Sequence, residues 1–168
     1  MTKTINNYSV IVRNFTFGVE DSLVSTVGLL AGIAFAGVES ETIILTGLVL
    51  IFVEAFSMAV GSLLSEQSVE EYEAKKEVSL SKPAIAAIVM LVSYIVSGLI
   101  PLAPYVFLSS TNAIFWSIGL TLVALLVLGA FNAHLFKIRM WRDALFTLLM
   151  GGLAIGIGIG VGQLVNHL

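Results

Sequence analysis

Five long apolar runs, separated by short polar segments, dominate the pattern of the chain. Each run holds about 20 or more residues, the length that an α-helix needs to cross the ~30 Å hydrocarbon core of a bilayer. The pattern therefore predicts an all-α integral membrane protein with five transmembrane helices in a single domain, residues 1–168. The predicted spans are approximately residues 15–38, 42–64, 84–108, 113–135 and 144–164.

The connection between the second and third predicted spans is the longest and the most charged, and it is expected to extend the second span as a cytoplasmic helix over residues 65–82. Carboxylates recur in it at helical spacing, which predicts that they share one helix face. These residues are Glu66, Glu70, Glu73 and Glu77. They form either an acidic vestibule that concentrates cations at the mouth of the protein or an ordinary solvated face.

Composition supports the membrane assignment, because 58% of the residues are hydrophobic and only 11% are charged, against about 45–50% and 25% in soluble domains. The chain has no cysteine, which excludes disulfides and thiolate metal sites. We find no nucleophile–base pair, phosphate-binding loop or basic patch in the sequence. We therefore expect neither an enzyme nor a nucleic-acid-binding protein, and no permanently bound cofactor.

The basic residues indicate the orientation of the chain. With five spans, all eight fall on one side of the membrane: Lys3, Arg13, Lys75, Lys76, Lys82, Lys137, Arg139 and Arg142. Cytoplasmic loops of membrane proteins carry an excess of Lys and Arg. The sequence thus predicts a cytoplasmic N-terminus and a C-terminus on the outside.

Small residues at four-residue spacing predict close helix packing in lipid, within the bundle or between two copies. They are Gly28, Gly32 and Ala36 in the first span and Gly152, Gly156 and Gly160 in the fifth, where Gly158 and Gly162 are offset from the stripe. In the third span, Pro101 and Pro104 are expected to kink or end the helix.

Carboxylates inside the first two spans are the main functional signal, because a charge at the centre of a span costs roughly 2.5–3.5 kcal/mol on insertion scales. Glu20 and Asp21 lie near the start of the first span, and Glu54 lies in the second, one helical turn before Met58. Since the two spans are antiparallel, Asp21 and Met58 are expected at the same depth. Glu54 is expected about 6 Å nearer the midplane, on the same face as Met58.

This set of side chains suits a divalent transition metal. Carboxylates bind Fe²⁺, Mn²⁺ and Mg²⁺, whereas a thioether favours the softer transition ions. We expect Asp21, Glu54 and Met58 to bind the ion, with Glu20 as a further candidate. Buried carboxylates can take up protons when no metal is present, so metal and protons would be exchanged. The alternatives are structural: Asp21 paired with Arg13 or the helix dipole, Glu54 as a buried hydrogen-bonded acid, and Met58 as a core gap-filler.

Three motifs together resemble the vacuolar iron transporter family, also called the yeast calcium-cross-complementer-type Fe/Mn transporters, over nearly the whole chain. The motifs are RNFTFGVEDSLVSTVGLLAG (13–32), FSMAVGSLLS (56–65) and LIPLAPY (99–105). In the first, Asp21 matches the Asp of the family motif, while Ser22 stands where Gly is usual. In the second, Met58 and Gly61 match the family's Met and Gly.

The resemblance implies a five-span homodimer that moves Fe²⁺, and often Mn²⁺, out of the cytoplasm in exchange for protons. It also implies that Asp21 and Met58 lie on the translocation path near the dimer axis. Two features depart from the family. Its usual Glu two turns before the Met is Leu50 here, while Glu54 lies one turn before it. The short segment 65–82 stands where many members carry a metal-binding cytoplasmic domain.

The combined prediction is a divalent-metal exporter with Fe²⁺ or Mn²⁺ as its transported substrate. Its expected partners are the metal ion, the proton, the lipid bilayer and a second copy of the chain. One alternative is a non-transporting membrane protein that keeps the fold as an assembly or regulatory partner, and another is a transporter or channel for a different cation. The chain is small and shows no targeting segment, which favours a prokaryotic cytoplasmic membrane.

Overall fold

The computed structural model describes residues 7–137 and 140–166, and these residues are helical apart from the connections. The five helices are α1 (Asn7–Phe35), α2 (Ser40–Ala74), α3 (Ser81–Phe107), α4 (Ser110–Phe136) and α5 (Met140–Asn166). Each contains a stretch long and apolar enough to cross a membrane. The prediction of an all-α protein with five spanning helices is therefore confirmed, and each helix begins somewhat before its predicted span.

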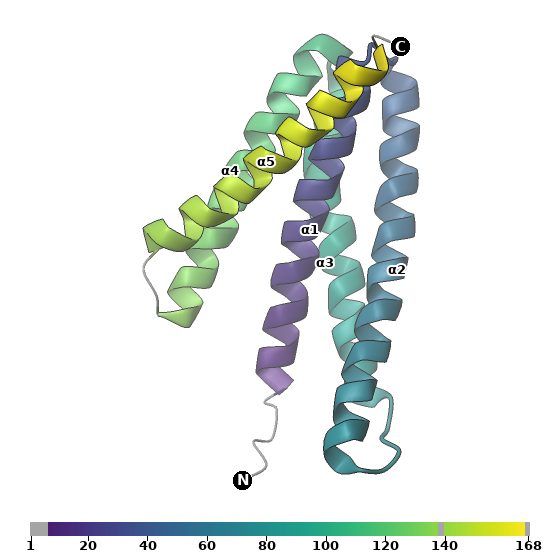
Figure 1. Ribbon diagram of the computed structural model, residues 1–168, viewed down its shortest axis with the longest axis vertical. Helices are drawn as coiled ribbons and strands as arrows, with labels where there is room; N and C mark the ends of the chain where they lie inside the picture. Colours follow the sequence, from purple (N-terminus) through teal and green to yellow (C-terminus); the bar gives the residue numbers. More distant parts are fainter. Residues whose placement is uncertain (1–6, 138–139, 167–168) are drawn as a thin grey trace.

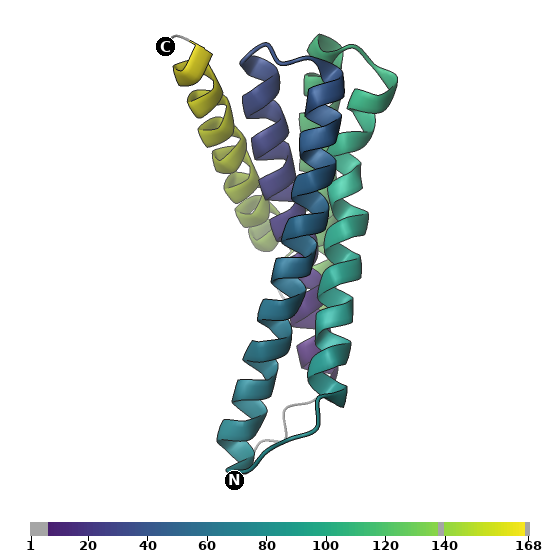
Figure 2. The same ribbon diagram turned by 90° about the vertical axis from the view of Figure 1, so that its right-hand side faces the viewer.

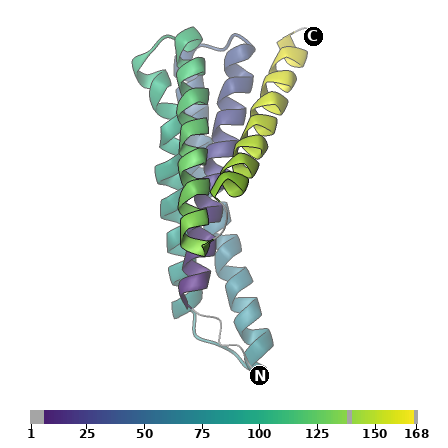
Figure 3. The same cartoon turned by 90° about the vertical axis from the view of Figure 1, so that its left-hand side faces the viewer.

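Helix α1 is the centre of the bundle and contacts all four other helices. Figure 1 shows α1, α2 and α3 running alongside one another, while α4 and α5 form a pair that leans away at the end where the two are connected. Figure 2 shows that α2 and α3 pack along their length and that α5 lies on the other side of α1. In Figure 3, α5 is inclined to α4. The two termini lie at opposite ends of the bundle (Figure 1).

A cluster of buried apolar side chains lies toward the end of the bundle that holds the α1–α2 and α3–α4 connections. Its buried side chains are Leu30, Ala34, Ile43, Ile51, Leu102, Tyr105, Ala113 and Ile114. The Ser40 hydroxyl contacts the Ser110 hydroxyl at 2.6 Å and so joins the first turns of α2 and α4. Gly37, with a φ of 81°, adopts the left-handed conformation that glycine tolerates best, which lets α1 turn directly into α2.

Helices α1 and α5 pack backbone to backbone through glycines. A Cβ atom on Gly158 would overlap the carbonyl oxygen of Gly28, and one on Gly162 would overlap that of Gly32. On the α5 side, the contact is thus made by Gly158 and Gly162. The stripe of Gly152, Gly156 and Gly160 does not make this contact with α1. Among the described residues, no atom outside the backbone of α5 lies within 4 Å of the points where Cβ atoms on these glycines would lie.

Helix α2 ends at Ala74, so the predicted helical extension to residue 82 is wrong beyond that point. Lys75 caps the helix in the left-handed conformation with a φ of 53°. Its ammonium group lies 3.8 Å from the centre of the Tyr72 ring, which favours this turn. Glu77 therefore lies in the connection and not on the helix that carries Glu66, Glu70 and Glu73.

Helix α3 continues through both of its prolines to Phe107, so the prolines do not end it. The Ser117 hydroxyl of α4 donates a hydrogen bond of 2.7 Å to the Pro101 carbonyl. The Leu108 N–H donates one of 2.9 Å to the Pro104 carbonyl. The first bond joins α3 to α4 beside Pro101, and the second closes the last turn of α3.

The basic residues of the described part lie toward one end of the bundle, which we call the basic end. They lie near the start of α1, in or beside the α2–α3 connection, and beside the α4–α5 connection: Arg13, Lys75, Lys76, Lys82, Lys137 and Arg142. Lys3 and Arg139 lie outside the described residues. The grouping agrees with the alternation of five spans on which the orientation was predicted.

Candidate metal path

The seam between α1 and α2 holds the predicted site residues, and a buried polar contact sets its register. The Ser62 hydroxyl donates a hydrogen bond of 2.5 Å to the side-chain oxygen of Asn14, and both residues are buried. Asp21 lies about two helical turns after Asn14 on α1, and Glu54 lies about two turns before Ser62 on α2. The antiparallel register thus brings these two acidic residues opposite each other.

Asp21 and Glu54 form a pair of half-buried carboxylates in the seam, close enough for their charges to interact. The sequence analysis predicted that Asp21 and Met58 would lie at the same depth. In the structure, Asp21 is level with Glu54 instead. Met58 lies one turn nearer the basic end. Arg13, the expected structural partner of Asp21, pairs with Glu66 instead.

Tyr94 of α3 is buried and backs the carboxylate pair from the inside of the bundle. Its hydroxyl lies within electrostatic reach of Asp21 and Glu54 and 2.8 Å from the Ser25 hydroxyl. Three helices, α1, α2 and α3, therefore converge at the pair.

Ser22, which replaces the Gly usual in the resembling motif, is buried between α1 and α3. Its hydroxyl donates a hydrogen bond of 2.6 Å to the Tyr94 carbonyl. A Cβ atom on Gly98 would lie only 2.7 Å from this hydroxyl oxygen, so the glycine on α3 provides the room that the serine side chain needs. The departure from the motif is thus compensated across the helix contact.

A groove of about 680 Å³ follows the seam from the basic end toward the carboxylate pair. Met58 of α2 and Met90 of α3 both line it, together with polar side chains that include Ser57 and Ser62. Met90 is buried. Its sulfur packs against Gly18 of α1, 3.1 Å from the point where a Cβ atom on that glycine would lie. Two thioethers therefore line one groove, where the sequence had indicated a single one.

At the basic end of the groove, Arg13 and Glu66 form an ion pair. Glu66 is buried, and the same carboxylate oxygen, Oε1, also accepts a hydrogen bond of 3.3 Å from Nδ2 of Asn14. One polar network in the groove wall thus joins α1 to α2 through Arg13, Glu66, Asn14 and Ser62. Glu66 is a paired residue of this network and not a free carboxylate on a solvated face.

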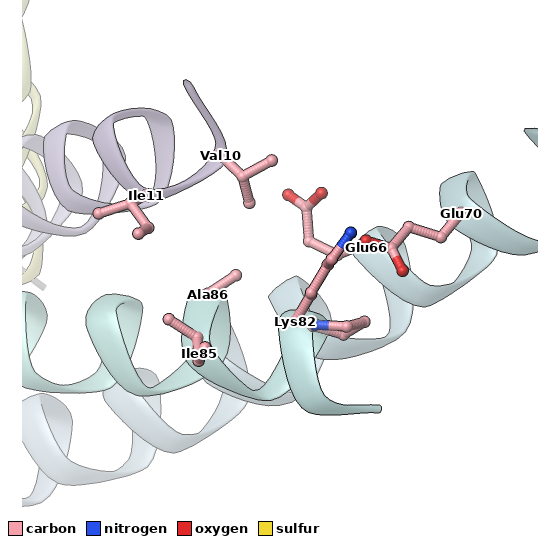
Figure 4. A pocket seen from close by; sticks show the side chains of 8 residues that line it. Val10, Ile11, Glu66, Glu70, Lys82, Ile85 and Ala86 are labelled. Atoms are coloured by element: carbon pink, nitrogen blue, oxygen red, sulfur yellow. The ribbon is translucent and has the colours of Figure 1, made fainter. Parts of the chain in front are cut away.

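The other acidic residues predicted for the vestibule lie outside the lining of this groove. Glu70 lines a small cavity of about 90 Å³ with Glu66 and Lys82, and Figure 4 shows the three side chains pointing toward the same space. Glu73 and Glu77 are exposed. Arg13 and Lys82 lie beside Glu66 and Glu70 and offset their negative charge. An acidic vestibule that concentrates cations therefore stays a prediction.

Glu20 is separate from the carboxylate pair. It lines another cavity of about 480 Å³, between α1 and the end of α4, with neighbours that include Tyr8, Thr16 and Phe136. Adjacent helical residues point about 100° apart, so Glu20 and Asp21 serve different surfaces of α1.

One protomer offers a metal ion two carboxylates and two thioethers in series. Among the described residues, no group of three or more His, Cys, Asp and Glu side chains could hold a metal. A divalent ion at Asp21 and Glu54 would therefore keep water or gain ligands from elsewhere. An open shell of this kind suits a transported ion, which must bind well enough to enter and weakly enough to leave.

Met90, Tyr94 and the Arg13–Glu66 pair were not assigned to the site from the sequence. The available signal was the four-residue spacing of Met90 and Tyr94, which places them on one face of α3. That spacing does not say which neighbouring helix the face contacts. The ion pair could be predicted only if the offset between α1 and α2 along the bundle were known.

Comparison with known proteins adds an independent finding. A family model described as VIT family matches residues 12–80 and 68–163. Vacuolar iron transporter homolog 5 of Oryza sativa subsp. japonica is 28% identical over 165 residues, which cover 91% of this chain and 79% of the relative. Vacuolar iron transporter homolog 4 of Arabidopsis thaliana is 28% identical over 166 residues, or 92% and 84% of the two chains.

Vacuolar iron transporter 1 of Oryza sativa subsp. japonica is more similar over a shorter stretch, with 38% identity over 96 residues that cover 54% of this chain. The match spans only 38% of that relative's length. For the protein of the same name from Eucalyptus grandis the share is 41%. The chain thus aligns with less than half of these two longer relatives.

Proposed function

The chain belongs to the VIT family, and from that premise we propose that it exports Fe²⁺ or Mn²⁺ from the cytoplasm in exchange for protons. The names of its relatives refer to iron transport, and family members are transporters and not enzymes. The observation that carries the proposal is the Asp21–Glu54 pair in the α1–α2 seam. Carboxylates inside spanning helices are expensive and mark ion or proton pathways.

The proposed route follows the groove along the seam. The ion enters from the basic end, passes the thioethers of Met58 and Met90, and reaches the carboxylates of Asp21 and Glu54. Soft sulfur ligands before hard oxygen ligands favour a transition ion over Ca²⁺ or Mg²⁺. Both methionines line the groove, and Met58 lies one helical turn nearer the basic end than Glu54.

Proton exchange follows from the charges of the pair. Two negative charges inside spanning helices are costly unless they are compensated. One divalent ion or two protons neutralise the pair equally. Arrival of the metal would release protons to the cytoplasmic side, and its departure would let protons from the outside replace it.

A homodimer would complete the coordination shell. Where it lines the groove, α2 exposes Ser57, Gly61 and Ser65. Among the described residues, no atom outside the backbone of α2 lies within 4 Å of the point where a Cβ atom on Gly61 would lie. Small and polar residues at this depth serve helix–helix contacts better than they serve lipid contacts. We propose that a second copy packs on this face of α2 and brings its own ligands toward the path.

We further propose that residues 1–168 act as one transmembrane domain with the basic end in the cytoplasm and the C-terminus outside, in accord with the excess of basic residues in cytoplasmic loops. The protein is a multi-pass membrane protein, since five helices can span. The relatives named above are plant proteins with vacuolar names. They give no support to the expected prokaryotic cytoplasmic membrane.

The test is a flux measurement in proteoliposomes that contain a metal-sensitive dye. Fe²⁺, Mn²⁺, Zn²⁺ and Ca²⁺ are compared with and without a pH gradient, and a pH dye follows protons in parallel. We expect Fe²⁺ and Mn²⁺ flux that is coupled to an opposing proton flux. No flux of any ion would favour an assembly or regulatory protein. Preference for Ca²⁺ or a monovalent ion would favour a transporter of another cation.

Replacing Met58 by Leu is expected to reduce the discrimination among metals while changing the stability of the protein little. Leu and Met have similar volumes, and such exchanges usually cost less than about 1.5 kcal/mol. Without the thioether, the rate of Fe²⁺ uptake relative to Ca²⁺ should fall by roughly tenfold, equivalent to about 1.4 kcal/mol. Met90→Leu should act in the same direction.

The matched control for both variants is Met150→Leu, because Met150 is exposed on α5 and lies outside the groove. Initial rates of uptake of each metal are measured in the same liposome preparation. Equal metal selectivity in all three variants would show that the thioethers do not contact the ion.

A further inference from the structure

The Arg13–Glu66 ion pair is markedly uneven in its burial. The Glu66 side chain is 7% exposed, whereas the Arg13 side chain is 63% exposed. Removing a buried carboxylate's partner leaves a charge that water cannot reach, while an exposed guanidinium is readily hydrated. Arg13 is therefore the partner that can leave, and Glu66 is the partner that stays.

Glu66 is also held in place by groups other than Arg13. Asn14 donates to the same carboxylate oxygen at 3.3 Å, and Ser62 in turn donates to Asn14 at 2.5 Å. Asn14 additionally donates to the Val10 carbonyl at 2.9 Å, which fixes its amide on α1. A carboxylate with such neutral support keeps its position when its cationic partner swings away.

Glu66 lies where the groove and a small cavity meet. The residue lines the same groove as Met58 and also the small cavity that holds the side chains of Glu70 and Lys82 (Figure 4). The charged groups around it are thus Arg13 and Lys82, against a second carboxylate on the next helical turn. Loss of Arg13 alone would leave two carboxylates and one ammonium group around the cavity and the groove mouth.

We propose that Glu66 is the first residue to bind the transported cation and that Arg13 is a tethered competitor for it. This inference rests on the proposed function. In the absence of metal, the guanidinium occupies the carboxylate and joins α1 to α2. A divalent ion at the basic end displaces Arg13 into solvent, binds Glu66 and then moves on to the methionines. Arg13 returns behind the ion, which closes the mouth and restores charge balance.

The proposal predicts opposite effects of removing the two partners. In Arg13→Gln the competitor is gone, so the Mn²⁺ concentration that gives half-maximal uptake should fall about fivefold or more. In Glu66→Gln the first ligand is gone and the guanidinium remains, so this concentration should rise about tenfold. Arg13→Lys keeps the charge without the forked geometry and should lie between wild type and Arg13→Gln.

The experiment measures initial Mn²⁺ uptake against concentration in proteoliposomes, and Mn²⁺ binding to each purified protein in detergent by electron paramagnetic resonance. Lys76→Gln is the control for a lost positive charge, because Lys76 is exposed at the same end of the bundle and should leave both curves unchanged. Size-exclusion profiles report folding. If Arg13→Gln fails to fold, Arg13→Lys carries the test, since it must shift binding in the same direction.

A purely structural ion pair would weaken Mn²⁺ binding in both single variants or leave it unchanged in both, and either outcome would overturn the proposal. If Lys76→Gln shifted Mn²⁺ binding as much as Arg13→Gln, the shift would result from a general change in surface charge. That outcome would also overturn the proposal. If the wild type neither binds nor transports Mn²⁺ or Fe²⁺, the proposed function itself fails. Wild-type flux without the opposite shifts would refute the role of Arg13 and Glu66 alone.

Discussion

Asp21→Asn is expected to lower the rate of Fe²⁺ transport by roughly 10- to 100-fold while the protein stays folded. The substitution keeps the size of the side chain and removes the charge that would face the metal and Glu54. A contact to a charged group contributes about 1.5–3 kcal/mol, which corresponds to that range of rates. Glu54→Gln should have a similar effect, since Glu54 is the opposite member of the pair.

The control for this prediction is Glu20→Gln, because Glu20 lines a different cavity beside α4. Initial uptake rates in proteoliposomes are compared at equal amounts of incorporated protein, with melting curves in detergent to confirm folding. Transport by Asp21→Asn at the wild-type rate would show that the carboxylate pair lies off the path. A loss in Glu20→Gln equal to that in Asp21→Asn would show that Glu20 belongs to the site.

Gly158→Val is expected to disrupt the contact between α1 and α5 and to destabilise the protein strongly. The first added carbon would already overlap the Gly28 carbonyl oxygen, and backbone atoms cannot rotate away as side-chain atoms can. Overpacking costs about 1–3 kcal/mol in well-packed interiors and sometimes more. For a chain of this size, about 3 kcal/mol lowers the melting temperature by roughly 6–12 °C.

The matched control is Gly156→Val on the same helix. In the described part of the chain, no atom outside the backbone of α5 lies within 4 Å of the point where a Cβ atom on Gly156 would lie. The melting temperature in detergent, followed by the fluorescence of Trp116 and Trp141, should change little in this variant. Equal destabilisation by the two substitutions would mean that helix propensity, and not the contact with α1, determines the stability.

The sequence was sufficient to predict the membrane class, the number of helices and the acidic residues of interest. Long apolar runs leave little choice, since a bilayer admits helices of a set length whose backbone groups are satisfied internally. Asp21 and Glu54 were recognisable for the same reason, because carboxylates are costly inside such runs. These inferences use one helix at a time and need no knowledge of how helices meet.

What could not be predicted depends on contacts between helices. The offset between α1 and α2 sets Asp21 against Glu54 and places Met58 one turn away, through the contact of Asn14 with Ser62. The rotation of α3 about its axis decides that Met90 lines the groove. Periodicity shows that a helix has faces but does not say which neighbour each face meets.

One local error lies at the end of α2. The acidic segment after the second span has good helix formers, but Lys75 adopts the left-handed conformation and ends α2. In α5 two glycine patterns overlap, and only the one containing Gly158 and Gly162 faces α1. Small-residue spacing predicts close packing but cannot choose between two stripes on one helix.

The most direct test of the proposed path compares Asp21→Asn, Glu54→Gln and the double variant by their initial rates of Fe²⁺ uptake in proteoliposomes. Residues that act as a unit are strongly non-additive, because either single loss already disables the unit. If the two carboxylates bind one ion, the double variant should transport no more slowly than the slower single variant. Losses that multiply in the double variant, or single variants that retain the wild-type rate, would contradict a shared metal site at Asp21 and Glu54.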